Sequence, residues 1–461
     1  MISVRSLVTG LALAGLLVFP AGAETLQDAL VAAYNNNPQL LAQRAQVRAT
    51  DETVPQALGG WRPTVSLTGQ TGRQHSENNV RESNTSPRSL TGNLSQPIYR
   101  GGRTTASVSQ AESNVLAARA FLHQTEQTIL NGVVAAYMNV LRDQAIVELN
   151  RNNESVLSRQ LQATRDRFEV GELTRTDTAQ AESRLSGATT TRIQAENNLI
   201  ASRAVYQRLV GTPPVDLTPA PAITGLPETQ DDAIRIALDE NPTVVQAEYV
   251  EEASRYAVRS ALGVLLPTVS LNASASRSEN QSTTTTTTTN VGATDTQSIT
   301  AQVSVPLYQS GSEYAAVRAA KETNSQRRIE IDVQRRQAIE NTIRAWSSLL
   351  TATDRIRSGA DQVRAAEVAL DGVRQESDVG SRTTLDVLNA EQELLNARVA
   401  LVVAERDEYV AAFDLRSAIG RLTAAQLALP VEVYDPAIHY RAVRNKLFGL
   451  STPDESQAAR R

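Results

Sequence analysis

Few residues of this 461-residue chain have the type and the spacing that chemistry requires. The three histidines, His75, His123 and His439, are far apart, and none has a second ligand at the spacing of a metal site. The chain has no cysteine, and its acidic residues are mixed with Arg and Lys, as on a solvated helix face. We therefore expect no catalytic residues, no metal site and no cofactor, and we expect that the protein is not an enzyme.

Two aspartates stand apart because their surroundings recur. Asp177 and Asp386 each lie six residues after a Val-Gly pair, 209 positions apart. Only the second has an arginine four residues before it, Arg382, and an asparagine three residues after it, Asn389. Carboxylates attract cations and bind the guanidinium group of arginine strongly. These four residues include the positions at which the two copies differ in charge and polarity.

The surroundings recur because the chain is duplicated. Asn37-Pro38 returns as Asn241-Pro242, and residues 63–67 return as 267–271, both 204 positions later. Further on the displacement is 209, which places five extra residues in the connection of the second strand pair. A repeat near 200 residues is a duplicated half rather than a solenoid unit. We assign residues 24–211 to the first repeat and residues 229–420 to the second.

Three segments lie outside the repeats. Residues 1–23 have the basic start, apolar run and small-residue end of a signal peptide. Residues 212–228 form a Pro-rich linker, and residues 421–461 are expected to strap around the body and end in a disordered tail. Beyond the signal, no run approaches the roughly 20 apolar residues of a spanning helix. The net charge of −5 makes nucleic acid an unsuitable partner.

Each repeat predicts a short helix and a long helical hairpin. The short helix is interrupted at the Asn-Pro pair, because proline lacks a backbone donor. Residues 103–210 form the first hairpin, with one helix up to residue 170 and a turn at Gly171. Apolar residues recur every seven positions in this helix, as in a coiled coil. Residues 312–419 repeat the pattern, with the turn at Gly380.

Between the short and the long helices, each repeat predicts a pair of strands. The pairs occupy residues 63–98 and 267–307, where apolar and polar residues alternate. We expect long polar loops at their outer ends, at residues 74–89 and around the threonine run 283–289. An apolar face about ten residues long fits a tilted membrane strand, but alternation alone fits a half-buried soluble hairpin equally well.

Together these features resemble the TolC-like outer-membrane efflux and secretion proteins over nearly the whole mature chain. The resemblance rests on the duplicated order of elements, the two Asn-Pro pairs, the Pro-Ile-Tyr and Pro-Leu-Tyr strand ends at residues 97–99 and 306–308, and the tip sequences 170–177 and 379–386. It implies a mainly α fold with a membrane β part. Four transmembrane strands per protomer would close a twelve-stranded barrel in a homotrimer, continued by a periplasmic helical tube.

The resemblance also implies roles for the turn residues. Asp386 and Asn389 would form a gate ring at the threefold axis; familiar members have an acid in place of Asn389, so this ring would select cations less strongly. Arg382 and Asp177 would form a latch between neighbouring coiled coils, weakened because Ser377 replaces a familiar tyrosine. The tips that an adaptor would grip are Val170, Gly171, Leu173, Val379 and Gly380.

The implied function is a passive exit duct of a tripartite efflux or type I secretion system, located in the outer membrane and projecting into the periplasm. Its partners would be outer-membrane lipid, a periplasmic adaptor (membrane fusion) protein and an inner-membrane ABC or proton-driven transporter. The tail around residues 434–440 favours the type I secretion branch. The alternative is a soluble periplasmic coiled-coil scaffold or adaptor, which would not explain the alternating strands.

Overall fold

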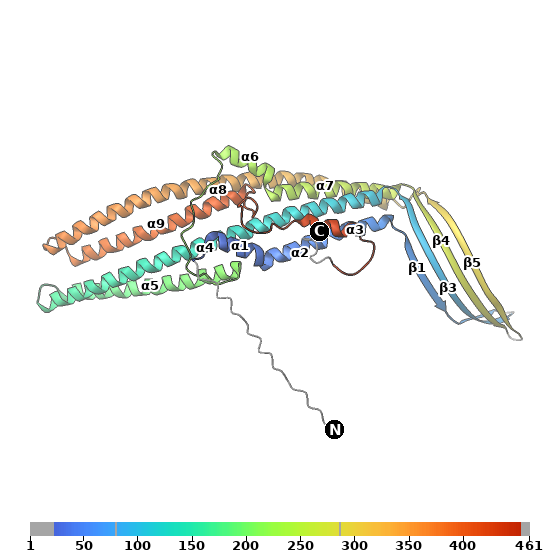
Figure 1. The fold of residues 1–461 in the computed structure, drawn as a ribbon, viewed down its shortest axis with the longest axis horizontal. Coiled ribbons are helices and arrows are strands. Elements are labelled where there is room, and N and C mark those ends of the chain that lie inside the picture. The colour runs from blue at the N-terminus through green and yellow to red at the C-terminus, as the bar shows by residue number, and fades with distance from the viewer. Residues whose placement is uncertain (1–22, 79–80, 285–286, 453–461) are drawn as a thin grey trace, which may run out of the picture.

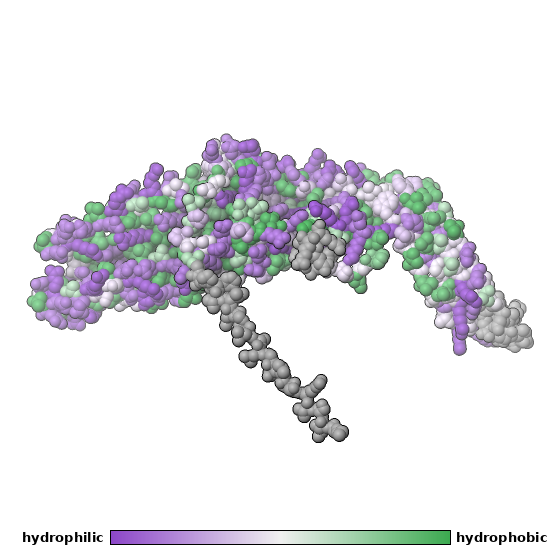
Figure 2. Space-filling view, in the orientation of Figure 1, coloured by the Kyte–Doolittle hydropathy of each residue, from purple (hydrophilic) through white to green (hydrophobic). Residues whose placement is uncertain are grey.

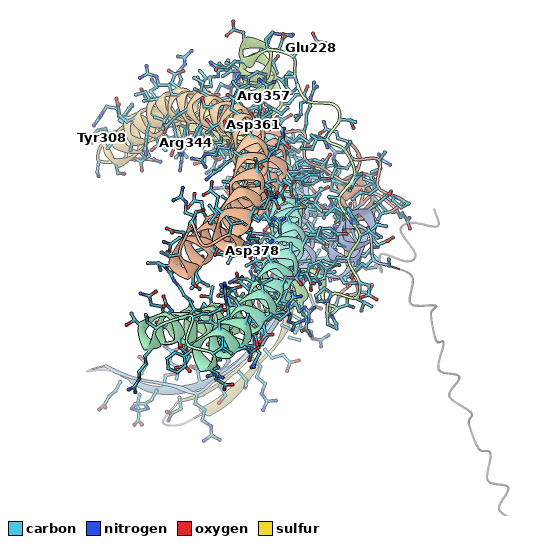
Figure 3. The ribbon with its side chains drawn as sticks, turned by 90° about the vertical axis from the view of Figure 1, so that its left-hand side faces the viewer. Glu228, Tyr308, Arg344, Arg357, Asp361 and Asp378 are labelled. Carbon is cyan, nitrogen blue, oxygen red and sulfur yellow. The ribbon has the colours of Figure 1, made fainter. Side chains whose placement is uncertain are left out.

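The protein is an elongated body with a sheet at one end and two helical hairpins at the other (Figure 1). The computed structural model describes residues 23–78, 81–284 and 287–452. The predicted signal peptide, apart from Ala23, and the end of the predicted tail lie outside these ranges. Seen from the hairpin end, the helices follow an arc (Figure 3). In the described part of the chain, no helix is long and apolar enough to cross a membrane.

Each repeat begins with two helices that meet at the Asn-Pro pair. They are α1 (Leu26–Asn36) and α2 (Pro38–Asp51), and α6 (Gln230–Glu240) and α7 (Pro242–Leu262). The two asparagines cap the second helix of each pair, and both also bind the end of a hairpin. Asn37 Nδ2 donates to the Leu209 carbonyl at 2.9 Å, and Asn241 Nδ2 donates to the Ala418 carbonyl at 2.8 Å. The recurring Asn-Pro pair therefore fixes the hairpin to the body in both repeats.

The hairpins consist of α4 (Arg103–Glu169) with α5 (Arg175–Val210), and α8 (Ser312–Asp378) with α9 (Thr384–Ala418). These bounds differ from the predicted helix ends by one residue at most. The seven-residue spacing marks the buried face of α4, where Val115, Leu122 and Ile129 are 2%, 5% and 3% exposed. The main apolar cluster joins the middle of α4 to α1, to the ends of α5 and α9, and to the segment after α9.

Short elements lead from the helices into the sheet. The first repeat has α3 (Thr53–Leu58) and the 3₁₀ turn η1 (Gly59–Trp61), and the second has the 3₁₀ turn η2 (Gly263–Leu265). The strands are β1 (Thr64–Thr71), β2 (Gln74–Asn78), β3 (Arg81–Arg100), β4 (Thr268–Thr284) and β5 (Thr287–Ser304). The sheet is antiparallel in the order β1, β3, β4, β5, and β2 extends the line of β1 along β3. The outer edges of the described sheet are therefore β1 with β2 on one side and β5 on the other.

The prediction of long outer loops is wrong for most of their residues. Residues 74–78 and 81–89 lie in β2 and β3, and Thr284 of β4 pairs with Thr287 of β5. Residues 79–80 and 285–286 of the expected loops lie outside the described residues. Strand pairing satisfies the backbone N–H and C=O groups of a residue whether its side chain is polar or apolar. The polar composition of these segments therefore did not mark the end of the sheet.

The pairing register keeps apolar residues on one face of the sheet. Val65 lies opposite Leu94, Leu94 opposite Ala273, and Ala273 opposite Ile299. One position along, residues 66, 93, 274 and 298 form a polar row of Ser and Asn. A shift of one residue in the register of any strand pair would move the apolar side chains of that strand to the opposite face of the sheet. Val65 and Ile299 are 76% and 77% exposed in the single chain, so the apolar face is uncovered.

The segment after α9 crosses the body and contains a helix that was not predicted, α10 (Pro436–Val443). It packs against α2 and α4 through polar contacts. Glu126 of α4 accepts a bond from the Ala424 backbone at 2.7 Å, and Gln127 donates to the Gly420 carbonyl. His439 Nδ1 lies 2.9 Å from Asp51 Oδ2 of α2, and both side chains are buried. These polar contacts tie the C-terminal strap to α2 and α4.

Candidate functional site at the hairpin tips

The two hairpin tips have the same backbone geometry. The Gly171 N–H donates to the Phe168 carbonyl at 3.0 Å, and the Gly380 N–H donates to the Ser377 carbonyl at 3.0 Å. Both glycines have positive φ angles, +83° and +81°, which are strained for any residue with a Cβ. The glycine of each pair is therefore needed locally to end the first helix and reverse the chain, whatever docks at the tip.

Asp177 and Asp386 cap the helices that follow the turns. Thr174 Oγ1 donates to Asp177 Oδ2 at 2.7 Å, and Thr383 Oγ1 donates to Asp386 Oδ2 at 2.8 Å. In each case the backbone N–H of the threonine also donates to the same oxygen, and the aspartate N–H returns a bond to the threonine hydroxyl. This is a reciprocal capping box. The Thr-x-x-Asp spacing is the signal of this motif in the sequence.

The capping bonds also favour the ionised form of the two aspartates. The hydrogen bonds from Thr174 hold the pKa of the Asp177 carboxyl below its ordinary value. Those from Thr383 do the same for the pKa of Asp386, with a smaller contribution from the charge of Arg382. Both carboxylates are therefore ionised at neutral and mildly acidic pH. Asp386 can act as a fixed negative charge at the tip.

Arg382 and Asp177, the predicted latch pair, are engaged within their own hairpins. Arg382 Nε donates to Glu376 Oε2 at 2.8 Å across the second turn. Asp177 bonds to Thr174, as described above. The first turn has a matching ion pair, in which Arg167 Nε lies 3.1 Å from Glu172 Oε2. A latch between neighbouring chains stays a prediction. To form it, Arg382 would have to leave Glu376 of its own chain and bind Asp177 of another.

Asn389 makes a contact that the sequence analysis missed. Its Oδ1 accepts a hydrogen bond from Arg184 Nη2 of α5 at 2.8 Å, which links the two hairpins of one chain. Beside it, Leu388 of α9 is 2% exposed and packs against Leu157 and Ala188 of the first hairpin. Arg184 lies seven residues after Asp177, hence two turns further along the same face of α5. This spacing is the sequence signal that places Arg184 on the same side of the hairpin as the tip aspartate. We call this bond with its apolar neighbours the interhairpin contact.

The predicted docking residues are exposed at the tips. Val170 and Val379 are 71% and 80% exposed, and both glycines are exposed, whereas Leu173 is half-buried. Figure 2 shows apolar surface at the ends of both hairpins, within mostly polar flanks. Both copies thus expose a valine at matching positions, and its role in docking stays a prediction.

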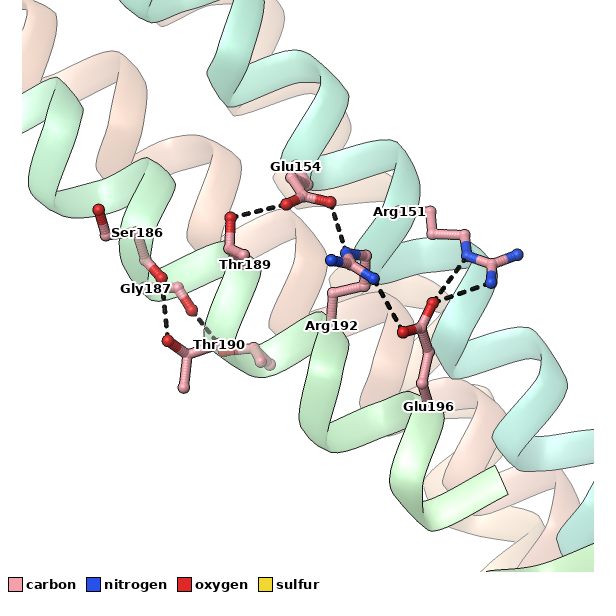
Figure 4. A network of polar contacts seen from close by, with 9 residues as sticks. Arg151, Glu154, Ser186, Gly187, Thr189, Thr190, Arg192 and Glu196 are labelled. Atoms are coloured by element: carbon pink, nitrogen blue, oxygen red, sulfur yellow. Dashed lines mark hydrogen bonds and ion pairs between the residues drawn. The ribbon is translucent and has the colours of Figure 1, made fainter. Parts of the chain in front are cut away.

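The first hairpin has a polar network that its copy lacks. Arg192 of α5 lies 2.6 Å from Glu154 and 2.8 Å from Glu196, and Glu196 also accepts from Arg151 of α4 at 2.9 Å (Figure 4). The positions 209 residues later are Ala360, Val363, Leu401 and Glu405, which cannot repeat it. In the second hairpin α8 and α9 are joined by separate pairs such as Arg398 with Glu367, at 2.7 Å. The network therefore joins α4 to α5 through contacts that the second hairpin does not repeat at the same positions.

The three histidines lie outside the two hairpin tips. Within the described ranges no three His, Cys, Asp or Glu side chains lie close enough to hold a metal ion. His75 lies on the sheet beside Asn84, and His439 is bonded to Asp51. His123 lies 3.9 Å from Glu126, which is bonded to the strap.

Comparison with known proteins agrees with the fold and the duplication. The sequence profile of the outer membrane efflux protein family matches residues 29–212 and 233–421, one match for each repeat. The outer membrane efflux protein BepC of Brucella suis is 40% identical over 434 residues, with 94% of this chain and 93% of BepC covered. The outer membrane protein TolC of Vibrio cholerae is 27% identical, with 89% and 93% covered.

A solved structure supports the architecture independently. The CmeC outer membrane channel of Campylobacter jejuni superimposes with a TM-score of 0.77 at 16% identity, covering 94% of this chain and 90% of that chain. At this identity the likeness concerns the fold alone. With both repeats matched by the family profile, the sequence and the fold lead to one conclusion: the chain belongs to the outer membrane efflux protein family, the TolC-like channels of the outer membrane.

Proposed function

We propose that three copies of this chain form the exit duct of a tripartite export system. The observation that carries the proposal is the sheet, in which an apolar row crosses all four strand lines in register and two edges stay unpaired among the described residues. One sheet of four strand lines can neither close nor cover its apolar face. Pairing β5 of one copy with β1 of the next, three times, would close a barrel with its apolar face towards lipid and its polar rows towards water.

In this trimer the second hairpin would line the periplasmic entrance. Asp386, held ionised by its capping bonds, would supply one charge per chain near the axis, and Asn389 would add none. The interhairpin contact keeps Asn389 engaged with Arg184, which supports a role in holding the hairpins together rather than in the ring. The Arg382–Asp177 latch would then act between chains, while Arg184 and Asn389 act within each chain.

The partners follow from the position of the tips. The exposed Val170 and Val379, at the end of the body opposite the sheet, are suited to a periplasmic adaptor, which would couple the duct to an inner-membrane ABC or proton-driven transporter. Energy would come from that transporter. Asp435 caps α10 and His439 binds Asp51, so these tail residues have a role in packing. Assignment to the type I secretion branch stays a prediction.

Fractionation and conductance test the proposal together. The protein expressed with its signal should be recovered in the outer membrane as a heat-sensitive trimer, and the purified trimer should conduct ions across a planar bilayer. Full recovery in the soluble periplasmic fraction without detergent would contradict it and favour the alternative scaffold. A Val379→Asp variant should keep the trimer and the conductance but lose export in cells, because a charge would face the apolar surface of the adaptor. Undiminished export would remove this tip from the docking site.

A further inference from the structure

The loop after α10 exposes a cluster of large apolar side chains. Leu447, Phe448 and Leu450 are 69%, 88% and 104% exposed. Scattered apolar residues on a surface are common, but three within four consecutive positions form a patch that marks an interaction site. We call residues 444–450 the apolar loop.

The apolar loop is held firmly from behind. Arg444 Nη2 donates to Glu112 Oε1 of α4 at 3.0 Å, and Tyr440 Oη donates to the same carboxylate at 3.2 Å. At the other side, Arg62 Nη1 donates to the Lys446 carbonyl at 3.0 Å. In Figure 1 this end of the chain, dark red, curves out beside α3, near the point where the strands leave the helical body. The backbone is thus anchored while the apolar side chains face outward.

The bond from Arg62 also fixes the level of the loop along the molecule. Arg62 lies three residues before Val65, the first apolar residue of the in-register row that crosses the sheet. At about 3.3 Å per extended residue, the two positions are about 10 Å apart. The polar headgroup zone on each side of a bilayer is about 5–8 Å thick. If the apolar row lies in lipid, position 62 lies about 2–5 Å beyond the headgroup zone, a distance that an extended Phe or Leu side chain of the apolar loop can span.

The charged residues around the apolar loop also fit a position at the membrane surface. Arg441 is exposed on α10, and Lys446 and Arg444 lie within the loop, so three cations flank the three apolar side chains. Glu112 neutralises Arg444, and Lys446 Nζ donates to the Ser451 carbonyl, which leaves both cations near the loop backbone. Basic residues beside Phe and Leu are typical of segments that bind the surface of an anionic bilayer.

We propose that the apolar loop is a membrane anchor: Leu447, Phe448 and Leu450 insert into the inner leaflet of the outer membrane, and Arg441 and Lys446 contact anionic phospholipid headgroups. The inference rests on the proposed membrane insertion of the sheet. It adds a second contact with lipid, made by the C-terminal strap rather than by the strands. Because the strap is bonded to α2 and α4, this contact would fix the helical body relative to the membrane plane.

The chain has no cysteine, so a single introduced cysteine can carry a nitroxide label at one chosen position. Phe448→Cys is compared with two control variants in the full-length trimer, reconstituted into vesicles of phosphatidylethanolamine and phosphatidylglycerol. Leu67→Cys reports the apolar face of the sheet, where residue 67 is 73% exposed. Glu228→Cys reports water, since residue 228 is exposed in the linker before α6 (Figure 3). Electron paramagnetic resonance then measures the accessibility of each label to oxygen, which is concentrated in lipid, and to a water-soluble nickel chelate.

The label at position 448 should give an oxygen-to-chelate ratio several-fold above that at position 228 and close to that at position 67. The ratio should fall when phosphatidylcholine replaces phosphatidylglycerol. A ratio equal to that at position 228 would overturn the anchor. So would low accessibility to both reagents, which would mean that a neighbouring copy covers the loop. If position 67 is itself reached by the chelate, the membrane sheet fails and with it the proposed function. A lipid-exposed position 67 with a water-exposed position 448 rejects the anchor alone.

Discussion

The bond between Arg184 and Asn389 predicts a measurable change in gating. It joins the two hairpins within one chain at 2.8 Å, and Arg184→Ala removes it while the adjacent Leu388 packing is kept. If opening of the entrance separates the hairpins, the bond stabilises the closed state only. Arg184→Ala should then shift the equilibrium of the trimer towards the open state.

The size of the shift follows from the geometry. A solvent-accessible hydrogen bond to a charged donor contributes about 0.5–1 kcal/mol. With one bond in each of three chains, about 1.5–3 kcal/mol of closed-state stability would be lost. Since 1.36 kcal/mol corresponds to a tenfold change, the open-to-closed ratio should rise about 10- to 150-fold. The effect should shrink only slightly at high salt, because the acceptor is a neutral amide.

Single-channel recording in planar bilayers measures this ratio directly. Arg165→Ala is the matched control, because Arg165 lies near the same tip but bonds to Glu182 of its own hairpin, at 2.6 Å. Asn389→Ala should reproduce the effect of Arg184→Ala, and the double variant should add little to either. If Arg184→Ala opens the channel no more than Arg165→Ala does, or if the two partners behave independently, the bond has no part in gating.

Three further results are expected. Arg382→Ser should raise the mean conductance of the trimer, because the latch between chains would lose its donor; unchanged conductance would refute the latch. Asp386→Asn should weaken the block of conductance by multivalent cations added on the periplasmic side. Thr383→Ala, which loses the cap but keeps the charge, should not weaken it. Equal block of the unchanged protein and both variants would mean that Asp386 does not lie at the entrance. Burial raises the pKa of Asp51, against the opposing effects of its His439 and Arg119 neighbours, so its ionisation costs stability at neutral pH and that cost disappears as the pH falls through the raised pKa. Asp51→Asn should therefore raise the thermal midpoint at pH 7, by a margin that narrows towards acidic pH; a constant margin would contradict this.

The helices were predictable because their signals are local. Thr25, Thr174 and Thr383 each precede an aspartate by three residues and start a helix, and the seven-residue spacing identifies the buried face of α4. The sheet was harder to predict. Its polar outer residues form strands through pairing of β3 with β4, whose partners such as Arg88 and Glu279 are far apart in the chain. Helix α10 was missed although Asp435 and Pro436 are favourable first residues of a helix.

The site was predictable in position but not in its contacts. The Val-Gly turns and the recurring aspartates could be located because both copies display them. The partner of Asn389 is 205 residues away on another helix, so only the packing of the two hairpins reveals it. Likewise, Arg382 has Glu376 within reach across the turn, and sequence spacing alone does not decide between that carboxylate and one from another chain.

The edges of β1 and β5, which stay unpaired among the described residues, have a genetic consequence. If three chains must join edge to edge, a dimer still exposes two edges, and each chain is needed by both of its neighbours. A variant that folds and pairs normally but fails at the entrance would then enter mixed trimers. With equal amounts of normal and defective chains, only about one trimer in eight would consist of normal chains alone, by the cube of one half. Mutations at the tips should therefore be dominant, whereas mutations that prevent edge pairing should be recessive.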